Sequence, residues 1–294
     1  MALTLFNAQD QSTKRERIII YSDPGLGKSR LMLSLTPRFG NILYYAADDN
    51  SEFLDSISED KMGRVFVIKP GGDDDIVNFQ SFCETDWKGM EGTVLADGRV
   101  FPKIDTIVVD TYTTVVERTL QATAEQGLAG AEKHFKVGDP KGEGGITIPN
   151  RGDYRGNDSL SMGFLDTLFD KQRDFHIIFG CHETLKYIED VCVGGGPAHP
   201  GRRMLKELPA RFSTVIRLIR DTAEIPEPEF HVENVVIAVT ENDGQFIAKT
   251  RTKNESEKSP LARVILDRNP INFWQKYDAI YAPKTVQTEE NSNV

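Results

Sequence analysis

The residues with the clearest chemical potential are Gly27, Lys28 and Ser29, a glycine followed by a lysine and a serine. They end a loop that begins at Ser22, and an apolar, β-branched run at residues 18–20 leads into that loop. Strand, glycine-rich loop and helix form the setting of a phosphate-binding P-loop, in which backbone amides and the lysine surround phosphate oxygens. The serine hydroxyl of such a loop is a ligand for Mg²⁺. The pattern predicts a site for a nucleoside triphosphate with Mg²⁺.

One position departs from the G-x-x-x-x-G-K-[ST] pattern, because Ser22 stands where the pattern has its first glycine. An ordinary turn between a strand and a helix, with an exposed lysine, is the alternative interpretation. It would leave the apolar strand, the glycine pair and the Lys-Ser placement as three coincidences. The residues expected to bind the nucleotide are Ser22, Asp23, Pro24, Gly25, Leu26, Gly27, Lys28, Ser29 and Arg30.

A second chemical signal is the apolar run at residues 105–110, which ends in Asp110. A carboxylate at the end of a buried strand can hold Mg²⁺ or its water opposite Ser29, as a Walker B aspartate does. Asp110 could equally cap the helix expected from Thr113 onward, and the two interpretations are compatible. Ser29 and Asp110 are the predicted metal ligands.

These residues need a sheet to position them, and the chain offers a series of buried-strand candidates. Strands are expected at residues 17–21, 41–46, 64–68, 105–110, 175–179 and 212–220. Helices are expected after the P-loop to Leu35, from about residue 75 to 87, from 114 to 126, and across the apolar positions between 160 and 169. The strand at 41–46 runs into an acidic cluster, Asp48, Asp49 and Glu52, at the strand end that faces ligands in open α/β sheets.

Two long, uneven stretches interrupt this series, at residues 127–156 and 184–205. Long loops on the carboxyl side of a parallel sheet suggest function, and inserted segments without a role are the alternative. Residues 93–103 predict a hairpin or loop with a turn at Asp97-Gly98. Residues 234–240 and 245–250 bracket a turn and predict a late β-hairpin, closed by Lys249-Thr250-Arg251.

Composition narrows the class of protein. The 294 residues carry a formal net charge of −10, which argues against a surface coated for DNA binding but leaves room for local basic loops. No apolar run approaches 18 residues, so no membrane span is expected. Cys83, Cys181 and Cys192 are odd in number and unclustered, which suggests a reducing compartment.

With these motifs in this order, the chain resembles RecA-fold ATPases across roughly residues 15–255. It is most similar to short phage-encoded nucleotide-binding proteins linked to single-strand annealing and recombination. The resemblance implies one RecA-like α/β domain over residues 1–282, with a mainly parallel twisted sheet flanked by helices and a C-terminal β-hairpin. Residues 1–16 would be a flexible lead-in and residues 283–294 a disordered tail.

The resemblance also implies roles for single residues. Asp48 becomes the candidate general base, in place of the usual glutamate, with Asp49 and Glu52 as alternates. His182 ends the strand after Asp110, where the fold has a residue that senses the γ-phosphate. Lys249 and Arg251 match a Lys-x-Arg pair that reaches the ATP of a neighbouring subunit, so the catalytic set is Lys28, Asp48, Asp110, His182, Lys249 and Arg251. An acidic turn, a structural histidine and a solvent-exposed basic pair are the competing interpretations.

The two long stretches occupy the places of the DNA-binding loops of RecA-like filaments. Residues 133–155 hold five Lys or Arg against three Asp or Glu. Backbone contacts to single strands need such cations, and aromatic side chains such as Phe135, Tyr154 and Tyr187 can stack on bases. The candidate DNA contacts are Lys133, Lys136, Arg151, Arg155, Lys186, Arg202 and Arg203.

The resemblance predicts a Mg²⁺-dependent ATP hydrolase that binds single-stranded DNA and supports phage recombination, annealing or replication. Its partners would be further copies of itself in a ring or filament, single-stranded DNA and a single-strand-binding protein. It would act in the cytoplasm, the host's if the gene is carried by a phage. A nucleotide-gated regulatory or scaffolding protein and a helicase-like motor or loader are the alternatives, and the acidic net charge favours the scaffold.

Overall fold

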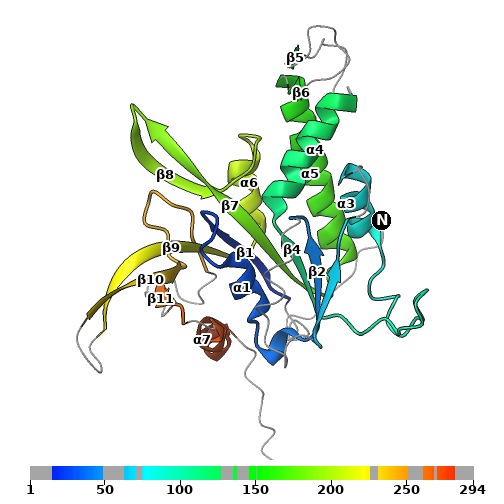
Figure 1. Cartoon of the computed structure of the whole chain (residues 1–294), viewed down its shortest axis with the longest axis horizontal. Coiled ribbons are helices and arrows are strands. Elements are labelled where there is room, and N and C mark those ends of the chain that lie inside the picture. The colour runs from blue at the N-terminus through cyan, green and yellow to red at the C-terminus, as the bar shows by residue number, and fades with distance from the viewer. Residues whose placement is uncertain are drawn as a thin grey trace, which may run out of the picture.

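In the computed structural model the chain folds as an α/β structure around one large sheet (Figure 1). The structure describes residues 15–48, 63–70, 75–126, 135–137, 146–149, 151–225, 231–250, 261–267 and 270–281. The strands are β1 (Arg17–Ser22), β2 (Ile42–Ala46), β3 (Val65–Ile68), β4 (Thr106–Asp110), β5 (Phe135–Val137), β6 (Ile146–Ile148), β7 (His176–Ile188), β8 (Val191–Pro197), β9 (Thr214–Ile225), β10 (His231–Val239) and β11 (Arg263–Ile265). The helices are α1 (Lys28–Leu33), the short 3₁₀ helix η2 (Pro37–Phe39), α3 (Asp75–Glu84), α4 (Tyr112–Gln126), α5 (Arg151–Lys171), α6 (Met204–Arg211) and α7 (Ile271–Tyr281).

The large sheet is mostly parallel, and its strand order places the P-loop strand near the middle. The order is β11-β10-β9-β1-β7-β4-β2-β3, with β8 paired to β7. The run from β9 to β3 is parallel, whereas β8, β10 and β11 are antiparallel to their neighbours. Strand β7 therefore lies between β1 and β4, which brings the carboxyl ends of these three strands to one edge of the sheet.

Alternation along the strands divides the buried side chains between two cores. Ile19 and Tyr21 of β1 face a core shared with α3, α4, α5 and α6. Ile18 and Ile20 face the opposite core, which contains α1 and Trp274 of α7. Successive side chains of a strand point to opposite faces, so an unbroken apolar run such as β1 is what a sheet covered on both sides requires.

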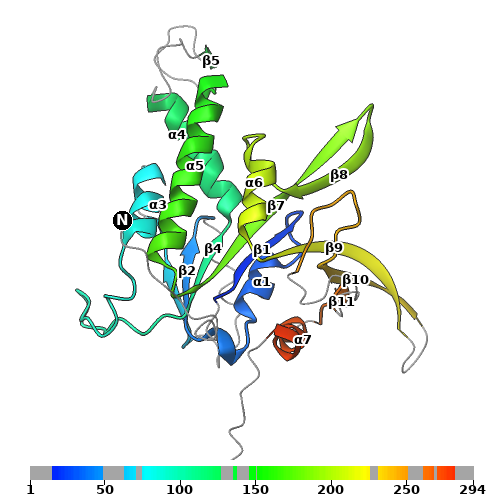
Figure 2. The ribbon, with the colours of Figure 1, turned by 180° about the vertical axis from the view of Figure 1, so that it is seen from behind.

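Figure 2 shows the same layers from behind, with α3, α4 and α5 grouped on one side of the sheet and α1 and α7 on the other. Two ribbons, the β7–β8 hairpin and the β9–β10 pair, extend beyond the layered body in both views. The small β5–β6 pair lies at the far end of α4 and α5. None of the helices in the described ranges is long and apolar enough to cross a membrane.

The α/β class and the core strands confirm the sequence predictions. The boundaries agree within a few residues except at the ends of β7 and β9, which continue to Ile188 and Ile225 instead of ending at 179 and 220. Two differences concern the predicted loops. Residues 151–156 belong to α5, so the first loop ends earlier than expected. Residues 184–197 are not a loop, because β7 continues to Ile188, the chain turns through Glu189 and Asp190 at positive φ, and it returns as β8. Only residues 198–203 connect this hairpin to α6 as an irregular segment.

The predicted late hairpin is wrong. Strand β10 pairs with β9 on one side and β11 on the other, so no hydrogen-bonding edge remains for residues 245–250. The turn itself forms, because Oδ1 of Asp243 accepts hydrogen bonds from the amides of Gln245 and Phe246. The chain then crosses to β8 and to the start of β9. The predicted tail at 283–294 and most of the lead-in lie outside the described residues.

Candidate functional site

The P-loop occupies the carboxyl end of β1 and opens directly into α1. Gly25 and Gly27 have φ angles of 79° and 86°, in the left-handed region that glycine adopts without strain. A Cβ at either position would meet no atom within 4 Å, so the backbone conformation rather than crowding requires these glycines. The amide of Leu31 donates to the carbonyl of Gly27 over 2.9 Å, which begins the helix.

Lys28 is folded back against its own loop. Its Nζ donates to the carbonyls of Ser22 and Asp23 over 3.2 and 3.1 Å, and to Oγ of Ser22 over 3.2 Å. Only 6% of the residue is exposed. Burial lowers the pKa of the ammonium, and the carboxylate of Asp110 opposes that shift. A cation held at the mouth of an amide-lined loop is suited to a phosphate oxygen.

Ser22 shows why the first glycine of the pattern is dispensable here. It is the last residue of β1, and it is absent from the described residues with positive φ, so a side chain fits without strain. The residue is fully buried, and its hydroxyl accepts the hydrogen bond from Lys28. Ser22 therefore gives Lys28 an extra oxygen partner that a glycine could not supply.

Ser29 and Asp110 meet as predicted, although 81 residues separate them. Oγ of Ser29 donates to Oδ2 of Asp110 over 2.5 Å. The hydroxyl of Tyr44, in β2, donates a short hydrogen bond to the same oxygen. Two donors on one oxygen hold the carboxylate in one orientation at the edge of the sheet.

The other oxygen of this carboxylate, Oδ1 of Asp110, is buried and has no hydrogen-bond partner among the described residues. Gly180 of β7 leaves the space for it, since a Cβ there would come within 2.7 Å of Oδ1. Burial raises the pKa of Asp110, and the hydrogen bonds from Ser29 and Tyr44 oppose the shift. A buried carboxylate oxygen without a partner is costly, so this geometry points to a ligand.

The oxygens of Ser29 and Asp110 fit the requirements of Mg²⁺, which prefers hard oxygen ligands and keeps several waters. Within the described ranges, no three His, Cys, Asp or Glu side chains gather closely enough to hold a metal ion by themselves. A magnesium ion held here would therefore need phosphate oxygens and water to complete its coordination.

Asp48 lies beside Asp110 at the same edge. Its Oδ2 accepts a hydrogen bond from Oγ1 of Thr111 over 3.4 Å, and the Ala47 amide donates to the Asp110 carbonyl over 2.8 Å. The carboxylate predicted to act on water is thus brought to the P-loop edge. Its alternates, Asp49 and Glu52, lie outside the described residues.

His182 also lies at this edge, in register with Ser22 on the neighbouring strand. Its Nδ1 is buried with no hydrogen-bond partner in the part of the chain that the structure describes. Burial lowers the pKa of the imidazole, and the nearby Lys28 lowers it further. The ring is therefore neutral at pH 7 and can offer one donor and one acceptor.

Thr113, which the sequence analysis did not select, ties this edge to the β7–β8 hairpin. Its Oγ1 accepts the backbone amide of His182 over 3.0 Å and donates to the carbonyl of Ala198 over 3.2 Å. The amide of Ala198 in turn donates to the carbonyl of His182 over 2.7 Å. Both ends of the hairpin are thereby fixed to the first turn of α4, three residues after Asp110.

The segment that contains Lys249 crosses between two strands. Gln245 and Ile247 exchange backbone hydrogen bonds with Gly195 of β8, and Lys249 exchanges two with Val215 of β9. Val215 is level with Ile19, three residues before Ser22, so the backbone of Lys249 lies below the P-loop edge. Arg251 lies outside the described residues.

Arg217 and Glu183 form a second feature beside the P-loop that sequence reasoning missed. Nε of Arg217 donates to Oε1 of Glu183 over 2.6 Å, and the guanidinium carbon lies 3.2 Å from the ring centre of Phe246. Both charged side chains are largely buried. They border a pocket of about 450 Å³ lined by Asp23, Pro24, Leu26, Glu183, Arg217, Leu218, Ile219 and Arg220.

The predicted DNA contacts are spread over several elements. Arg151 and Arg155 are exposed on the first turns of α5, and Lys186 is exposed on β7. Arg202 and Arg203 precede α6, where Arg203 donates to Glu207 over 2.6 Å. Lys136 belongs to β5, and Lys133 lies outside the described residues. Those of these cations that the structure describes belong to separate elements and form no single cluster.

Tyr44, Thr113, Glu183 and Arg217 are the residues at this edge that the sequence did not reveal. A faint signal existed for Tyr44, since a tyrosine in a fully buried strand needs a partner for its hydroxyl. The other three depend on which strands become neighbours. A scan against protein-family models found no match to this chain, and a search of curated proteins found no relative.

Proposed function

We propose that this protein is a Mg²⁺-dependent ATPase of the RecA-like type that acts with single-stranded DNA in phage recombination, annealing or replication. The observation that carries the proposal is the 2.5 Å hydrogen bond between Ser29 and Asp110, beside the buried Lys28. This hydrogen bond places the last residue of the P-loop next to the last residue of β4. A triphosphate with its metal ion requires a hydroxyl and a carboxylate in these two positions.

The proposal assigns a role to each functional residue at the carboxyl edge of the sheet. The loop amides and Lys28 bind the β- and γ-phosphates, and Ser29 with Asp110 would hold Mg²⁺. When bound, the ion would supply positive charge that offsets the charge of the transferring phosphoryl group. Asp48 accepts a proton from the attacking water, and the neutral His182 contacts the γ-phosphate side through its free ring nitrogen.

The pocket of about 450 Å³ beside the P-loop provides room for the base and ribose. Its volume falls within the roughly 300–1,000 Å³ common for small-molecule sites. Leu26 and Pro24 supply apolar contacts, and the Arg217–Glu183 pair supplies polar ones.

Lys249 and Arg251 act in trans in this proposal, on the nucleotide of a neighbouring copy. The backbone of Lys249 lies three residues below the P-loop edge of its own chain, which agrees with such a role. A complete site would then need an oligomer, and an isolated chain would hydrolyse ATP slowly.

Contact with single-stranded DNA is proposed for the β7–β8 hairpin. Lys186 offers a cation for phosphates, and Tyr187, which is 58% exposed, offers a ring on which a base can stack. Because Thr113 fixes the hairpin beside His182, a change at the γ-phosphate can alter the hairpin.

The same hairpin supports a second candidate function, a nucleotide-gated protein that binds protein partners. Leu185, Ile188 and Val191 expose apolar side chains near its tip, with Ile188 54% and Val191 64% exposed. Grouped exposed apolar side chains are a common feature of protein-binding surfaces.

Hydrolysis of ATP, measured with and without Mg²⁺ and a single-stranded oligonucleotide, tests the proposal. Particle size is measured in the same samples. We expect Mg²⁺-dependent turnover that the oligonucleotide increases and that Lys28→Ala removes, while Lys88→Ala, a change at an exposed lysine paired with Asp174, retains it. Turnover without stimulation by DNA favours the protein-binding candidate, and equal turnover by the Lys28→Ala variant overturns the ATPase proposal.

A further inference from the structure

A pocket lined by arginines lies at the amino end of the sheet, away from the P-loop. Its volume is about 240 Å³, and its lining includes Arg15, Arg17, Arg173 and Arg211 together with the polar Gln172 and Ser213. These residues come from the start of β1, the ends of α5 and α6, and the residue before β9. The lining residues that the structure describes include no carboxylate, although the whole chain has a net charge of −10.

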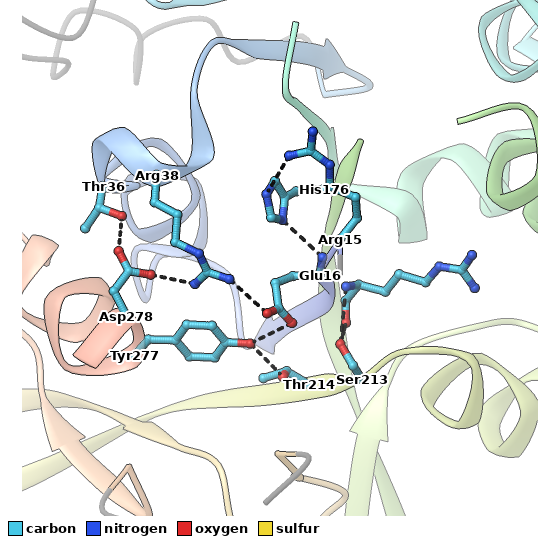
Figure 3. A network of polar contacts seen from close by, with 10 residues as sticks. Arg15, Glu16, Thr36, Arg38, His176, Ser213, Thr214, Tyr277 and Asp278 are labelled. Atoms are coloured by element: carbon cyan, nitrogen blue, oxygen red, sulfur yellow. Dashed lines mark hydrogen bonds and ion pairs between the residues drawn. The ribbon is translucent and has the colours of Figure 1, made fainter. Parts of the chain in front are cut away.

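Arg15 forms no ion pair within the described residues. The hydrogen bond from Lys88 lowers the pKa of the exposed Asp174 carboxyl, and the charges of Arg173 and Arg15 add to that shift. Its Nη1 lies 3.2 Å from Nε2 of His176, the contact drawn in Figure 3. Nδ1 of the same ring accepts the amide of Glu16 over 3.0 Å. Burial, with the charges of Arg15 and Arg38, lowers the pKa of His176 to about 3, so the ring is neutral and its one proton is on Nε2. Nε2 then offers Arg15 an N–H instead of an acceptor.

Arg17 and Arg211 are held in place by contacts with side chains of α5. The guanidinium carbon of Arg17 lies 4.0 Å from the ring centre of Phe169, and its Nη2 donates to the carbonyl of that residue over 3.5 Å. Arg211 forms an ion pair with Asp166, whose side chain is 65% exposed. Within the described ranges neither Arg15 nor Arg173 forms an ion pair, and both charges act on the exposed carboxyl of Asp174. The described lining therefore carries four guanidinium groups, beside which Asp166 and Asp174 are the acidic neighbours.

We propose that this pocket binds a phosphate group, carried either by a small free phosphate compound or by the backbone of a nucleic acid strand. The planar guanidinium presents a fork of donors that matches phosphate oxygens two at a time. The volume of about 240 Å³ suits one or two phosphate groups and is small for a whole nucleotide. Ser213 adds a hydroxyl at the pocket wall.

This site is separate from the P-loop. Arg17 begins β1 and Ser22 ends it, so about 17 Å of strand lies between them. Binding of phosphate to the arginine pocket can therefore be measured in a protein whose P-loop lacks Lys28. A negative result for phosphate binding to the pocket would then leave the ATPase proposal untouched, and a negative result for ATP hydrolysis would leave the pocket proposal untouched.

The test uses the full-length Lys28→Ala protein and sodium pyrophosphate as the probe, at constant ionic strength, with calorimetry as the readout. We expect saturable binding that Arg15→Gln and Arg173→Gln each weaken by about tenfold, which is the loss expected for one hydrogen-bonded charged group. Arg99→Gln is the matched control, because that exposed arginine pairs with Asp97 outside the pocket. Arg173 is exposed, so its substitution leaves the fold intact.

A labelled single-stranded oligonucleotide, titrated into the same variants, identifies the source of the phosphate. Weaker oligonucleotide binding by both pocket variants assigns the site to a nucleic acid backbone. Weaker pyrophosphate binding with unchanged oligonucleotide binding assigns it to a small phosphate compound. If neither titration differs between the pocket variants and Arg99→Gln, the proposal is wrong.

Discussion

The two ends of the central strands differ in how their buried polar groups are satisfied. At the carboxyl edge, Oδ1 of Asp110 and Nδ1 of His182 are buried without hydrogen-bond partners among the described residues. At the amino edge, Arg38 bridges Glu16 and Asp278 over 3.0 and 2.7 Å, as Figure 3 shows. Tyr277 completes that network through Glu16 and Thr214, both at 3.1 Å.

Polar residues therefore have two roles in this fold: at the amino edge they stabilise the structure, and at the carboxyl edge they are available to a ligand. In the Glu16–Arg38–Asp278 network the charged groups pair with one another. These pairs help to attach α7 to the sheet, and they offer few donors or acceptors to a ligand. The carboxyl edge retains unused capacity at a cost in stability, which proteins accept where a ligand binds. Substitutions at the two edges should therefore act on different measured quantities.

The largest expected effect is that of Lys28→Ala on turnover. Loss of the Lys28 ammonium should lower ATP hydrolysis by at least about 100-fold, the cost of removing one donor that stabilises a transition state. Thermal unfolding should change little, because within the described residues the hydrogen bonds of the ammonium go to its own loop. A variant that unfolds early would instead assign Lys28 a structural role.

Asp110→Asn should lower turnover while raising stability. Burial raises the pKa of Asp110 above its usual 3.8, so the ionised carboxylate destabilises the fold at neutral pH. The amide removes that charge, and at pH 7 we expect a Tm higher by about 2–4 °C, equivalent to about 1 kcal/mol.

The gain in stability should depend on pH in one direction. Below about pH 3.8 the carboxyl group is protonated in both the folded and the unfolded chain, so the two proteins should unfold alike. The advantage of Asp110→Asn should grow as the pH rises through the folded pKa. Calorimetric scans from pH 3 to 8 measure it, and a lower Tm at pH 7 would contradict the assignment.

Arg38→Gln should show the reverse pattern at the amino edge. It removes two ion pairs from a side chain that is 19% exposed, and we expect a loss of about 2 kcal/mol in the free energy of unfolding. Turnover per folded molecule should remain at the wild-type level, since the P-loop lies at the other end of β1. Urea titration with activity measured at low urea separates the two quantities.

The smallest expected effect concerns the pH dependence of His182. Burial and the neighbouring Lys28 lower its pKa, so the ring gains a proton only below the usual 6.5. Turnover should therefore stay level from pH 7 down through 6.5 and decline at lower pH, as a second cation forms beside Lys28. His182→Gln should remove that acidic decline and reduce turnover about tenfold at pH 7.

The core strands and the P-loop could be predicted because their signals are local. Apolar β-branched runs identify β1, β2 and β4, and Gly25, Gly27, Lys28 and Ser29 form one continuous motif. The β7–β8 hairpin was missed because its turn, Glu189-Asp190, lacks the glycine or asparagine that usually marks two-residue turns. The path of residues 245–250 was mistaken because β9 and β11 occupy both edges of β10.

Three features follow from the sequence alone: the P-loop, the alternation that buries both faces of the sheet, and the apolar run that ends in Asp110. Each depends on residues within one turn or one strand, where backbone geometry and hydrophobic burial act directly. Tertiary packing places β7 between β1 and β4, lets Tyr44 and Ser29 share one oxygen of Asp110, and lines one pocket with arginines from three segments. Those arrangements follow from packing between distant segments, which no local pattern encodes.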